Sequence, residues 1–394
     1  MPDSKFDGLS LSWLRKRRSD KWARYGPDVL PAWVAEMDFP LAPAVQKVLV
    51  DAIELGDCGY AHEGQIRQAF AEFAKWKFDW QLNPGILVLV ADIMSGVAEL
   101  LRAFTSAGEG VVINPPVYPP FYTTIRGVGR QIVPVPLRES TNGWQLDLQG
   151  LEAAFERGVR AYLLCNPHNP CGRVFSRAEL EAVAELALRF NVLVISDEVH
   201  SPLVMPGERH TPYVSIPAVQ QTTGFTILSA SKGWNIPALK CALIVPGSEE
   251  VAVKARELLP KDLIDRVSQL GIVASVSAFG TDGIRWLDEL VVYLDDNRRQ
   301  LRSLLMTELP EVGYQVPEAG YLAWLDCRAL GLGSNPARHF LDRGRVALYS
   351  GLDFGAEGEG YVRLNFGTSF SLVEEAIKRI RASIYGMSKA RAHP

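Results

Sequence analysis

Residues 225–235 read Phe225-Thr226-Ile227-Leu228-Ser229-Ala230-Ser231-Lys232-Gly233-Trp234-Asn235 and place one lysine just past a short apolar run, among hydroxyl groups and an aromatic ring. A lysine amine can form a Schiff base with an aldehyde when its surroundings keep it partly neutral and aim it at the carbonyl carbon. The hydroxyl groups of Ser229 and Ser231 could contact a phosphate nearby. The alternative is a surface lysine that follows a buried strand, and this stretch alone favours that alternative.

Further short apolar or β-branched runs flank this stretch. They lie at Ile86 to Ala91, Gly110 to Asn114, Gln131 to Val135, Ala161 to Cys165, Val192 to Ser196 and Ala242 to Val245. Helical or loop segments separate most of them, which predicts a mainly parallel sheet covered by helices on both faces. Ligands of such sheets bind beyond the carboxyl ends of the strands. The sequence therefore predicts an α/β fold whose site lies at that edge.

Helix signals divide the rest of the chain. Apolar spacing predicts a helix over 64–78, Ser95-Gly96 is expected to open another, and Ser176 with Glu179 forms a capping box for a helix that Asn191 ends. Past Gly247 the pattern is helical to about residue 309, with a long helix or a helix pair. Strands are expected at 321–326 and 361–366, followed by a helix from Ser371 that Glu374 caps.

The domain organisation follows from these elements. Residues 1–49 are rich in Trp, Pro and charged residues, and their prolines are expected to break any long element. We expect these residues to form an N-terminal arm that is part of a small domain. Residues 50–287 are expected to form the large domain and residues 288–394 a small α+β domain.

Composition excludes several classes of protein. The 394 residues are 47% hydrophobic and 22% charged, with a net charge of -4, which gives no basic field for nucleic acid or an anionic membrane. The five cysteines are scattered without a C-x-x-C pair, which argues against a disulfide framework or a zinc site and favours a reducing cytoplasm. No signal peptide or bilayer-spanning run is evident. The phosphate-binding patterns G-x-G-x-x-G after an early strand and G-x-x-x-x-G-K-[ST] do not occur.

Three signals at strand ends favour the catalytic interpretation of Lys232. They are the segment Asn166-Pro167-His168-Asn169-Pro170-Cys171-Gly172, the segment Ser196-Asp197-Glu198-Val199-His200, and Lys232 itself. Pyridoxal phosphate needs a carboxylate such as Asp197 to keep its ring nitrogen protonated. Asn169 would supply an amide donor to the ring's phenolic oxygen, and His200 could approach the same edge. Singly, a capping Asp or a turn Asn explains each residue, but together they predict a pyridoxal phosphate site.

Three more positions fit this site, each with a structural alternative. Ser95-Gly96-Val97 at a helix start could cradle a phosphate, or could be an ordinary helix cap. Tyr118, in Pro115-Pro116-Val117-Tyr118-Pro119-Pro120-Phe121, could lie flat on the cofactor ring or belong to the core. Arg363, in Tyr361-Val362-Arg363-Leu364-Asn365-Phe366-Gly367, could bind a substrate carboxylate bidentately or form a structural ion pair.

Taken together, these residues resemble the fold-type I pyridoxal phosphate enzymes, the aspartate aminotransferase superfamily, over nearly the whole chain. A narrower resemblance is to its cystathionine β-lyase (C–S lyase) branch, which includes cystalysin-like enzymes and the maltose-regulon modulator. It rests on the segments already quoted and on Lys21-Trp22-Ala23-Arg24-Tyr25-Gly26, Gly59-Tyr60 and Trp33-Val34-Ala35-Glu36-Met37-Asp38-Phe39-Pro40. The last of these is the most discriminating, since generic aminotransferases lack it.

The resemblance implies a role for each matching position. Lys232 is similar to the Schiff-base lysine that also moves the Cα proton, Asp197 to the partner of the ring nitrogen, and Arg363 to the carboxylate clamp. Tyr60 resembles the tyrosine that reaches the neighbouring subunit's phosphate, which implies a homodimer. The remaining matches are the ring-oxygen donor, the stacking aromatic and the phosphate contacts, namely Asn169, Tyr118, Gly96, Val97, Ser229 and Ser231.

Some positions depart from the family pattern. Glu36 replaces the usual Asp, Cys171 replaces Thr or Ser, and Gly233-Trp234 replaces Thr-Phe. Lys240 stands where aminotransferases place an arginine on the phosphate, so its phosphate contact is a hypothesis. These differences leave the preferred sulfur amino acid open, because the pocket depends on Trp33, Tyr118 and the partner subunit's Tyr60.

The expected reaction is α,β-elimination, which yields a thiol, pyruvate and ammonia. Arg363, Trp33 and Asn169 are the expected substrate-binding residues, and Tyr118 and Tyr60 are expected to assist Lys232. Transamination needs the same residues and remains the nearest alternative. A regulatory protein-binding module on the same fold is an alternative of another class, and it could coexist with catalysis.

Overall fold

The structure is a computed structural model that describes residues 4–140 and 143–386. The chain forms two compact units. The first, here called the arm unit, comprises the described parts of Met1–Pro40, Pro170–Gly172 and Leu290–Pro394. The second, here called the sheet unit, comprises the described parts of Leu41–Asn169 and Arg173–Glu289. The domain boundaries predicted after residues 49 and 287 stay a prediction, and the chain ends at 1–3 and 387–394 lie outside the described residues.

A seven-stranded sheet forms the centre of the sheet unit, in the order β2-β10-β9-β8-β7-β3-β4. Its strands are β2 (Val88–Val90), β3 (Gly110–Ile113), β4 (Gln131–Pro134), β7 (Ala161–Cys165), β8 (Leu193–Asp197), β9 (Gly224–Leu228) and β10 (Ala242–Pro246). Only β10 among them runs opposite to the other six strands. The predicted mainly parallel sheet is therefore confirmed. The carboxyl ends of the other six strands and the amino end of β10 lie at one edge.

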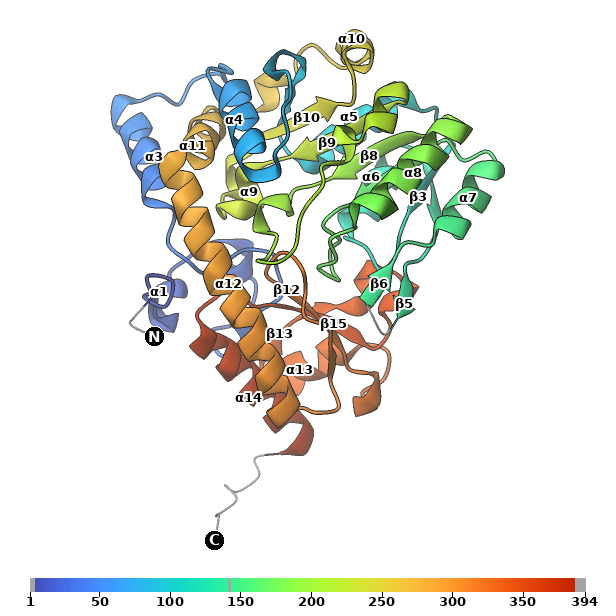
Figure 1. The fold of residues 1–394 in the computed structure, drawn as a ribbon. Coiled ribbons are helices and arrows are strands. Elements are labelled where there is room, and N and C mark those ends of the chain that lie inside the picture. Colours follow the sequence, from blue (N-terminus) through green and yellow to red (C-terminus); the bar gives the residue numbers. More distant parts are fainter. Residues whose placement is uncertain (1–3, 141–142, 387–394) are drawn as a thin grey trace. The chain divides into compact units, whose positions relative to one another are not determined.

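Both faces of this sheet are buried. On one face, alternate strand residues such as Leu163, Ile195 and Ile227 belong to a core with α5 (Ile93–Phe104), α6 (Pro120–Gly127) and α10 (Glu249–Leu258). Residues in between, such as Tyr162 and Val194, are buried on the opposite face. Helices α7 (Leu148–Glu156) and α8 (Arg177–Phe190) cover that face (Figure 1). The period of two residues per strand thus assigns Asp197 to the same face as α5.

Three helices, α3 (Pro43–Leu55), α4 (Ile66–Phe78) and α11 (Gln269–Phe279), pack together beside the sheet. Their aromatic residues hold the short helix α9 (Ala230–Gly233), which carries Lys232. The Trp234 side chain is fully buried, with its ring 5.5 Å from both Phe73 and Phe279, and its Nε1 donates to the Gly283 carbonyl oxygen at 2.9 Å. The unusual Trp234 therefore anchors the end of the lysine helix.

The arm unit contains an antiparallel sheet in the order β11-β12-β15-β14. These strands are β11 (Gly313–Tyr314), β12 (Leu322–Asp326), β14 (Tyr349–Ser350) and β15 (Tyr361–Asn365), and β1 (Leu30–Pro31) pairs separately with β13 (Val346–Ala347). Its helices are α1 (Leu11–Leu14), α2 (Asp20–Ala23), α13 (Pro336–Gly344) and α14 (Phe370–Tyr385). A hairpin of β5 (Arg138–Ser140) and β6 (Gly143–Gln145) belongs to the sheet unit, and α12 (Thr281–Glu308) is one continuous helix that continues into the arm unit.

Several predicted boundaries are wrong. Helix α3 begins at Pro43, inside the predicted arm, because proline suits the first turn of a helix and does not break it there. Helix α5 begins at Ile93, before the predicted Ser95-Gly96, because Asp92 accepts the Ser95 amide and caps the helix. Helix α14 follows Ser369 without a side-chain capping bond, so Glu374 does not form the predicted cap.

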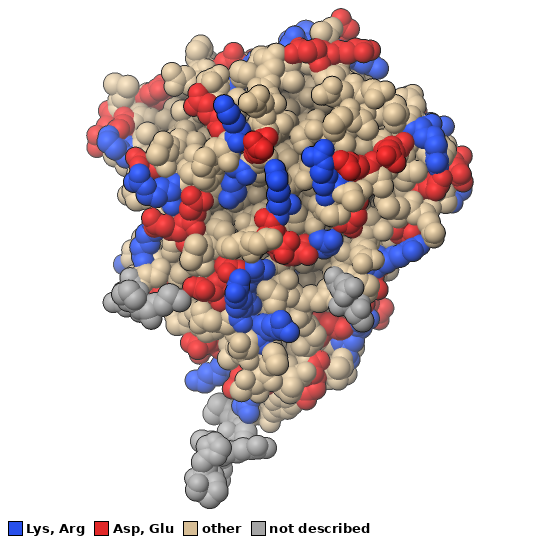
Figure 2. All heavy atoms as spheres, viewed as in Figure 1, with Lys and Arg blue, Asp and Glu red and all other residues tan. Residues whose placement is uncertain are grey.

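Charges on the surface are mixed in sign. The face in Figure 2 shows Lys and Arg interspersed with Asp and Glu, and ion pairs four residues apart, such as Arg177 with Glu181 and Arg338 with Asp342, account for part of this pattern. No helix of the described residues is long and apolar enough to cross a bilayer.

Candidate active site

Three of the predicted segments meet at the carboxyl edge of the central sheet. Asn166 to Asn169 follow β7, Asp197 ends β8, and Ser229 to Lys232 follow β9. Asp197 lies in register with Cys165 on one side and with Ile227 on the other. The sheet therefore brings these three strand ends side by side, as the sequence predicts.

Asp197 is a buried carboxylate that lacks full charge compensation. Its side chain accepts the Val199 amide at Oδ1 over 3.1 Å, and the residue is 4% exposed. Burial raises the pKa of Asp197 to about 7, the Val199 bond lowers it, Glu198 raises it further and the Lys232 amine lowers it. A carboxylate in such a place favours a cationic partner, because the partner restores the lost solvation.

Glu198 points to the opposite face of the sheet, where its burial is fully compensated. Its Oε1 accepts from Ser196, Thr226 and the Tyr213 amide at 2.8–3.0 Å, and its Oε2 pairs with His210 Nε2 at 2.8 Å. These bonds fix the turn that follows β8. The sequence analysis missed this cluster, whose members lie far apart in the chain.

Lys232 lies on α9, whose start depends on Ser229. The Ser229 hydroxyl accepts the Ser231 amide at 3.0 Å and donates to the Cys241 carbonyl oxygen at 2.7 Å. Ser229 thus ties the lysine helix to the start of β10. Its predicted phosphate contact stays a prediction, as does that of Ser231, and the Ser229 hydroxyl would have to turn away from Cys241 to donate to a phosphate.

The predicted phosphate contacts Gly96 and Val97 lie in α5, past its first turn. The Gly96 amide donates to the Asp92 carbonyl oxygen at 3.0 Å, and a Cβ at Gly96 would lie 3.2 Å from Val90, so this residue faces the sheet. Val97 lies deeper in the helix and is fully buried. Amides of the first helical turn have no partner within the helix, so we move the expected phosphate contact from Gly96 and Val97 to Ile93 and Met94.

Lys240 reaches this helix terminus from the segment before β10. Its Nζ lies 2.8 Å from Asp92 Oδ2, while Asp92 Oδ1 accepts the Ser95 amide. The Lys240 ammonium therefore lies beside the first turn of α5, where its charge is paired with the Asp92 carboxylate. This place is compatible with the hypothesis that Lys240 contacts a phosphate.

A buried histidine connects the loops of Tyr118 and Asn169. His168 Nε2 lies 2.8 Å from the Pro116 carbonyl oxygen, and burial lowers the pKa of His168 to about 4, so the neutral ring donates this bond at neutral pH. In one loop, the backbone N–H of Asn169 donates to Cys165 Sγ at 3.4 Å. In the other, the Tyr118 ring packs edge-on against Phe121. His168 therefore joins the two loops, a contact that the sequence analysis did not predict.

The other predicted residues lie in two places. His200 is buried in the turn after Asp197, and its carbonyl oxygen accepts the Leu203 amide. Arg363 and Trp33 lie together in the arm unit, where Arg363 Nη2 donates to the Trp33 carbonyl oxygen at 3.1 Å. The Arg363 guanidinium carbon is 4.9 Å from the ring centroids of both Tyr349 and Phe354. The arginine is therefore held in a fixed orientation in a strand of that unit.

The residues of the sheet unit fit pyridoxal phosphate. Asp197 favours a cation, the α5 terminus with Lys240 favours an anion, and Lys232 supplies an amine close enough to Asp197 to lower its pKa. A ligand with a protonated ring nitrogen, an aldehyde and a phosphate satisfies all three.

Comparison with known proteins agrees with this chemistry. Residues 41–380 match the family model for aminotransferase class I and II. A Mycobacterium leprae protein that bears the provisional name cystathionine beta-lyase is 45% identical over an alignment of 402 positions, which covers 96% of this chain and 98% of that protein. The cystathionine beta-lyase PatB of Bacillus subtilis is 34% identical over 93% of this chain and 97% of its own length.

The solved structures include a similar protein from Corynebacterium diphtheriae. It is described provisionally as a PLP-dependent beta-cystathionase, and it superposes with a TM-score of 0.91 at 34% identity. The match covers 96% of this chain and 99% of that one.

Proposed function

Because the chain belongs to the aminotransferase class I and II family, in its pyridoxal-phosphate-dependent carbon–sulfur lyase branch, we propose that it is a cystathionine β-lyase. The reaction is α,β-elimination on a sulfur amino acid, which gives a thiol, pyruvate and ammonia. Pyridoxal phosphate supplies an electron sink for the negative charge that develops at the substrate Cα. The side chains of this protein hold that group, orient the substrate and move the proton.

Each site residue has one proposed task. Lys232 Nζ would hold the cofactor covalently, and its free amine would remove the proton from the substrate Cα. Asp197 keeps the ring nitrogen protonated, and Asn169 and His200 contact the same ring, on which Tyr118 stacks. The phosphate is held by the α5 terminus together with Lys240, Ser229 and Ser231. Arg363 binds the substrate carboxylate, and Trp33 lies beside it.

One observation supports this proposal above the others: the sheet register brings the buried Asp197, at the end of β8, between the ends of β7 and β9, the strands that lead to Asn169 and Lys232. The test is to incubate the protein, loaded with pyridoxal phosphate, with cystathionine and to follow pyruvate and free thiol. Release of both in equal amounts supports the lyase. Transfer of the amino group to a keto acid without thiol release identifies an aminotransferase and contradicts the proposal.

We further propose that the working unit is a homodimer in the cytoplasm. Tyr60 is 93% exposed, and the neighbouring end of α3 exposes Ile53 and Leu55 at 61% and 82%. Large apolar side chains with this much exposed surface favour an interface with another protein surface. A second copy would cover them and bring Tyr60 to the partner's phosphate.

The expected result for Tyr60→Phe is a weaker affinity for pyridoxal phosphate, by about tenfold, because one hydrogen bond to a charged group is lost.

Leu55→Asp is expected to lower the dimer fraction in sedimentation experiments, because it places a charge at the proposed apolar interface. Leu188→Asp is the control, since Leu188 is another exposed leucine, on α8, with 42% of its surface exposed against 82% for Leu55. A monomeric wild-type protein with full activity would contradict the dimer.

A further inference from the structure

The segment Ala32 to Phe39 has no helix or strand of its own, yet its backbone oxygens are extensively bonded. The Trp33 oxygen accepts from Arg363, the Ala35 oxygen from Tyr321 and the Glu36 oxygen from Lys21. Arg17 donates to the oxygens of Met37 and Phe39 at 3.1 and 2.9 Å. Side chains from elsewhere in the arm unit therefore determine the path of this segment.

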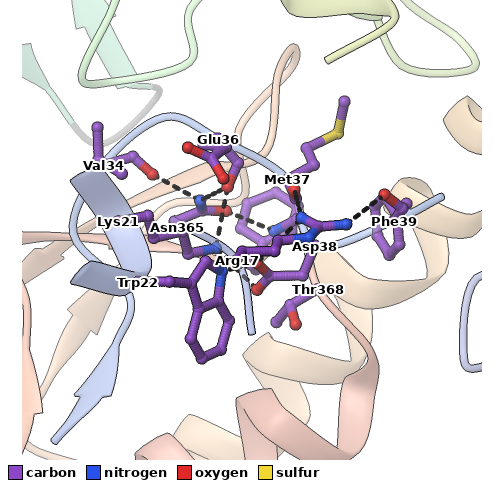
Figure 3. Close-up of polar contacts among 12 residues, drawn as sticks. Arg17, Lys21, Trp22, Val34, Glu36, Met37, Asp38, Phe39, Asn365 and Thr368 are labelled. Carbon is purple, nitrogen blue, oxygen red and sulfur yellow. Dashed lines mark hydrogen bonds and ion pairs between the residues drawn. The ribbon is translucent and has the colours of Figure 1, made fainter. Parts of the chain in front are cut away.

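A buried ion pair holds the carboxyl-terminal end of the segment Ala32 to Phe39. Lys21 Nζ lies 2.7 Å from Asp38 Oδ2, and the two side chains are 1% and 3% exposed. Asp38 Oδ1 accepts from Trp22 Nε1 at 2.9 Å, and Arg17 Nη1 lies 4.0 Å from the same oxygen. Figure 3 shows Arg17, Lys21 and Trp22 converging on Asp38. The charge of Asp38 is thus fully compensated, and its position is fixed from two sides.

The same segment is bonded to the strand that carries Arg363. Asn365 Nδ2 donates to the oxygens of Val34 and Glu36, each at 2.7 Å, as Figure 3 shows. Residues two apart in a strand point to the same face, so Asn365 and Arg363 contact neighbouring parts of the segment. The Glu36 oxygen accepts from Lys21 as well, at 2.9 Å, and so joins the ion pair to β15.

We infer that Lys21 and Asp38 are positioning residues for substrate-carboxylate recognition, acting through the Trp33 oxygen that orients the Arg363 guanidinium. The inference rests on the proposed role of Arg363. A guanidinium can bind a carboxylate with two parallel hydrogen bonds only in one orientation. A shift of the 32–39 backbone moves the Trp33 oxygen, and the guanidinium turns with it.

The test compares two amines that cannot undergo elimination. L-Alanine carries the α-carboxylate, and ethylamine does not. The absorbance change of the loaded protein gives the Kd of each. In Lys21→Met and in Asp38→Asn we expect the Kd of alanine to rise about tenfold, the loss expected when a charge-assisted hydrogen bond is weakened. The Kd of ethylamine should change less than twofold.

The controls separate positioning from general destabilisation. Asp342→Asn removes an exposed ion pair on α13 of the same unit and should change neither Kd. If the neutral variants unfold, Lys21→Arg keeps the charge but not the geometry, and the same selective loss is expected. Equal changes for both ligands, or none, overturn the inference. Wild-type protein that binds alanine no better than ethylamine contradicts the role of Arg363 itself, a separate failure.

Discussion

Lys232→Ala is expected to lower kcat for thiol release from cystathionine by roughly 10²- to 10⁴-fold through the loss of proton transfer alone. Loss of the covalent linkage to pyridoxal phosphate lowers it further. The physical reason is that no other amine is proposed to reach the substrate Cα. Thiol release is measured in the steady state at saturating substrate and cofactor, so that weaker cofactor binding does not enter the comparison.

Borohydride reduction identifies the lysine that carries the cofactor without a measurement of turnover. Reduction of the loaded wild-type protein should fix the cofactor on the peptide that contains Lys232, and the peptide mass identifies the modified lysine. Lys254→Ala, at an exposed lysine of α10, is the matched control and should retain both labelling and activity. Labelling of Lys240 instead, or lyase activity retained by Lys232→Ala, contradicts the assignment.

Local patterns predicted much of the fold and of the cofactor site. The run Ala161 to Cys165 matches β7 in full, because a buried parallel strand is apolar on both faces. The capping box of Ser176 and Glu179 forms as predicted, since it depends on residues three apart. The family and the cofactor followed from motifs at strand ends, where the chemistry of each residue type is specific.

Contacts between distant residues could not be predicted. Lys240 pairs with Asp92, and Ser229 donates to Cys241, because β10 inserts antiparallel between β2 and β9. The sequence shows seven similar apolar runs and no sign of this order. The pair of Lys21 and Asp38 likewise depends on the fold of the arm unit. These long-range pairs decide which groups remain available to a phosphate or a carboxylate.

Asp197→Asn is expected to have opposite effects on the loaded and the cofactor-free protein. In the loaded protein it removes the counter-charge of the ring nitrogen. Breaking a buried pair costs about 3–5 kcal/mol, so kcat/KM should fall by roughly 150- to 5,000-fold. In the cofactor-free protein it removes a carboxylate whose pKa burial raises from 3.8 to about 7. Since one pKa unit corresponds to about 1.4 kcal/mol, the variant should be more stable than wild type at pH 8, by on the order of 4 kcal/mol.

The pH dependence of this difference identifies its cause. A raised carboxyl pKa means that the folded state binds more protons than the unfolded state between pH 4 and pH 7, so stability is lost as the pH rises through that window. His168, whose pKa burial lowers from 6.5 to about 4, acts with the opposite sign over nearly the same range. Because wild type and variant share His168, subtracting their free energies of unfolding cancels its effect.

The difference between the two cofactor-free proteins should therefore be near zero below pH 4 and grow up to about pH 7, as measured by urea unfolding across this range. A difference independent of pH would mean that Asp197 is solvated in the folded protein. Because burial of Asp197 is the reason for assigning it to the ring nitrogen, that result would also remove the physical basis for its role with the cofactor.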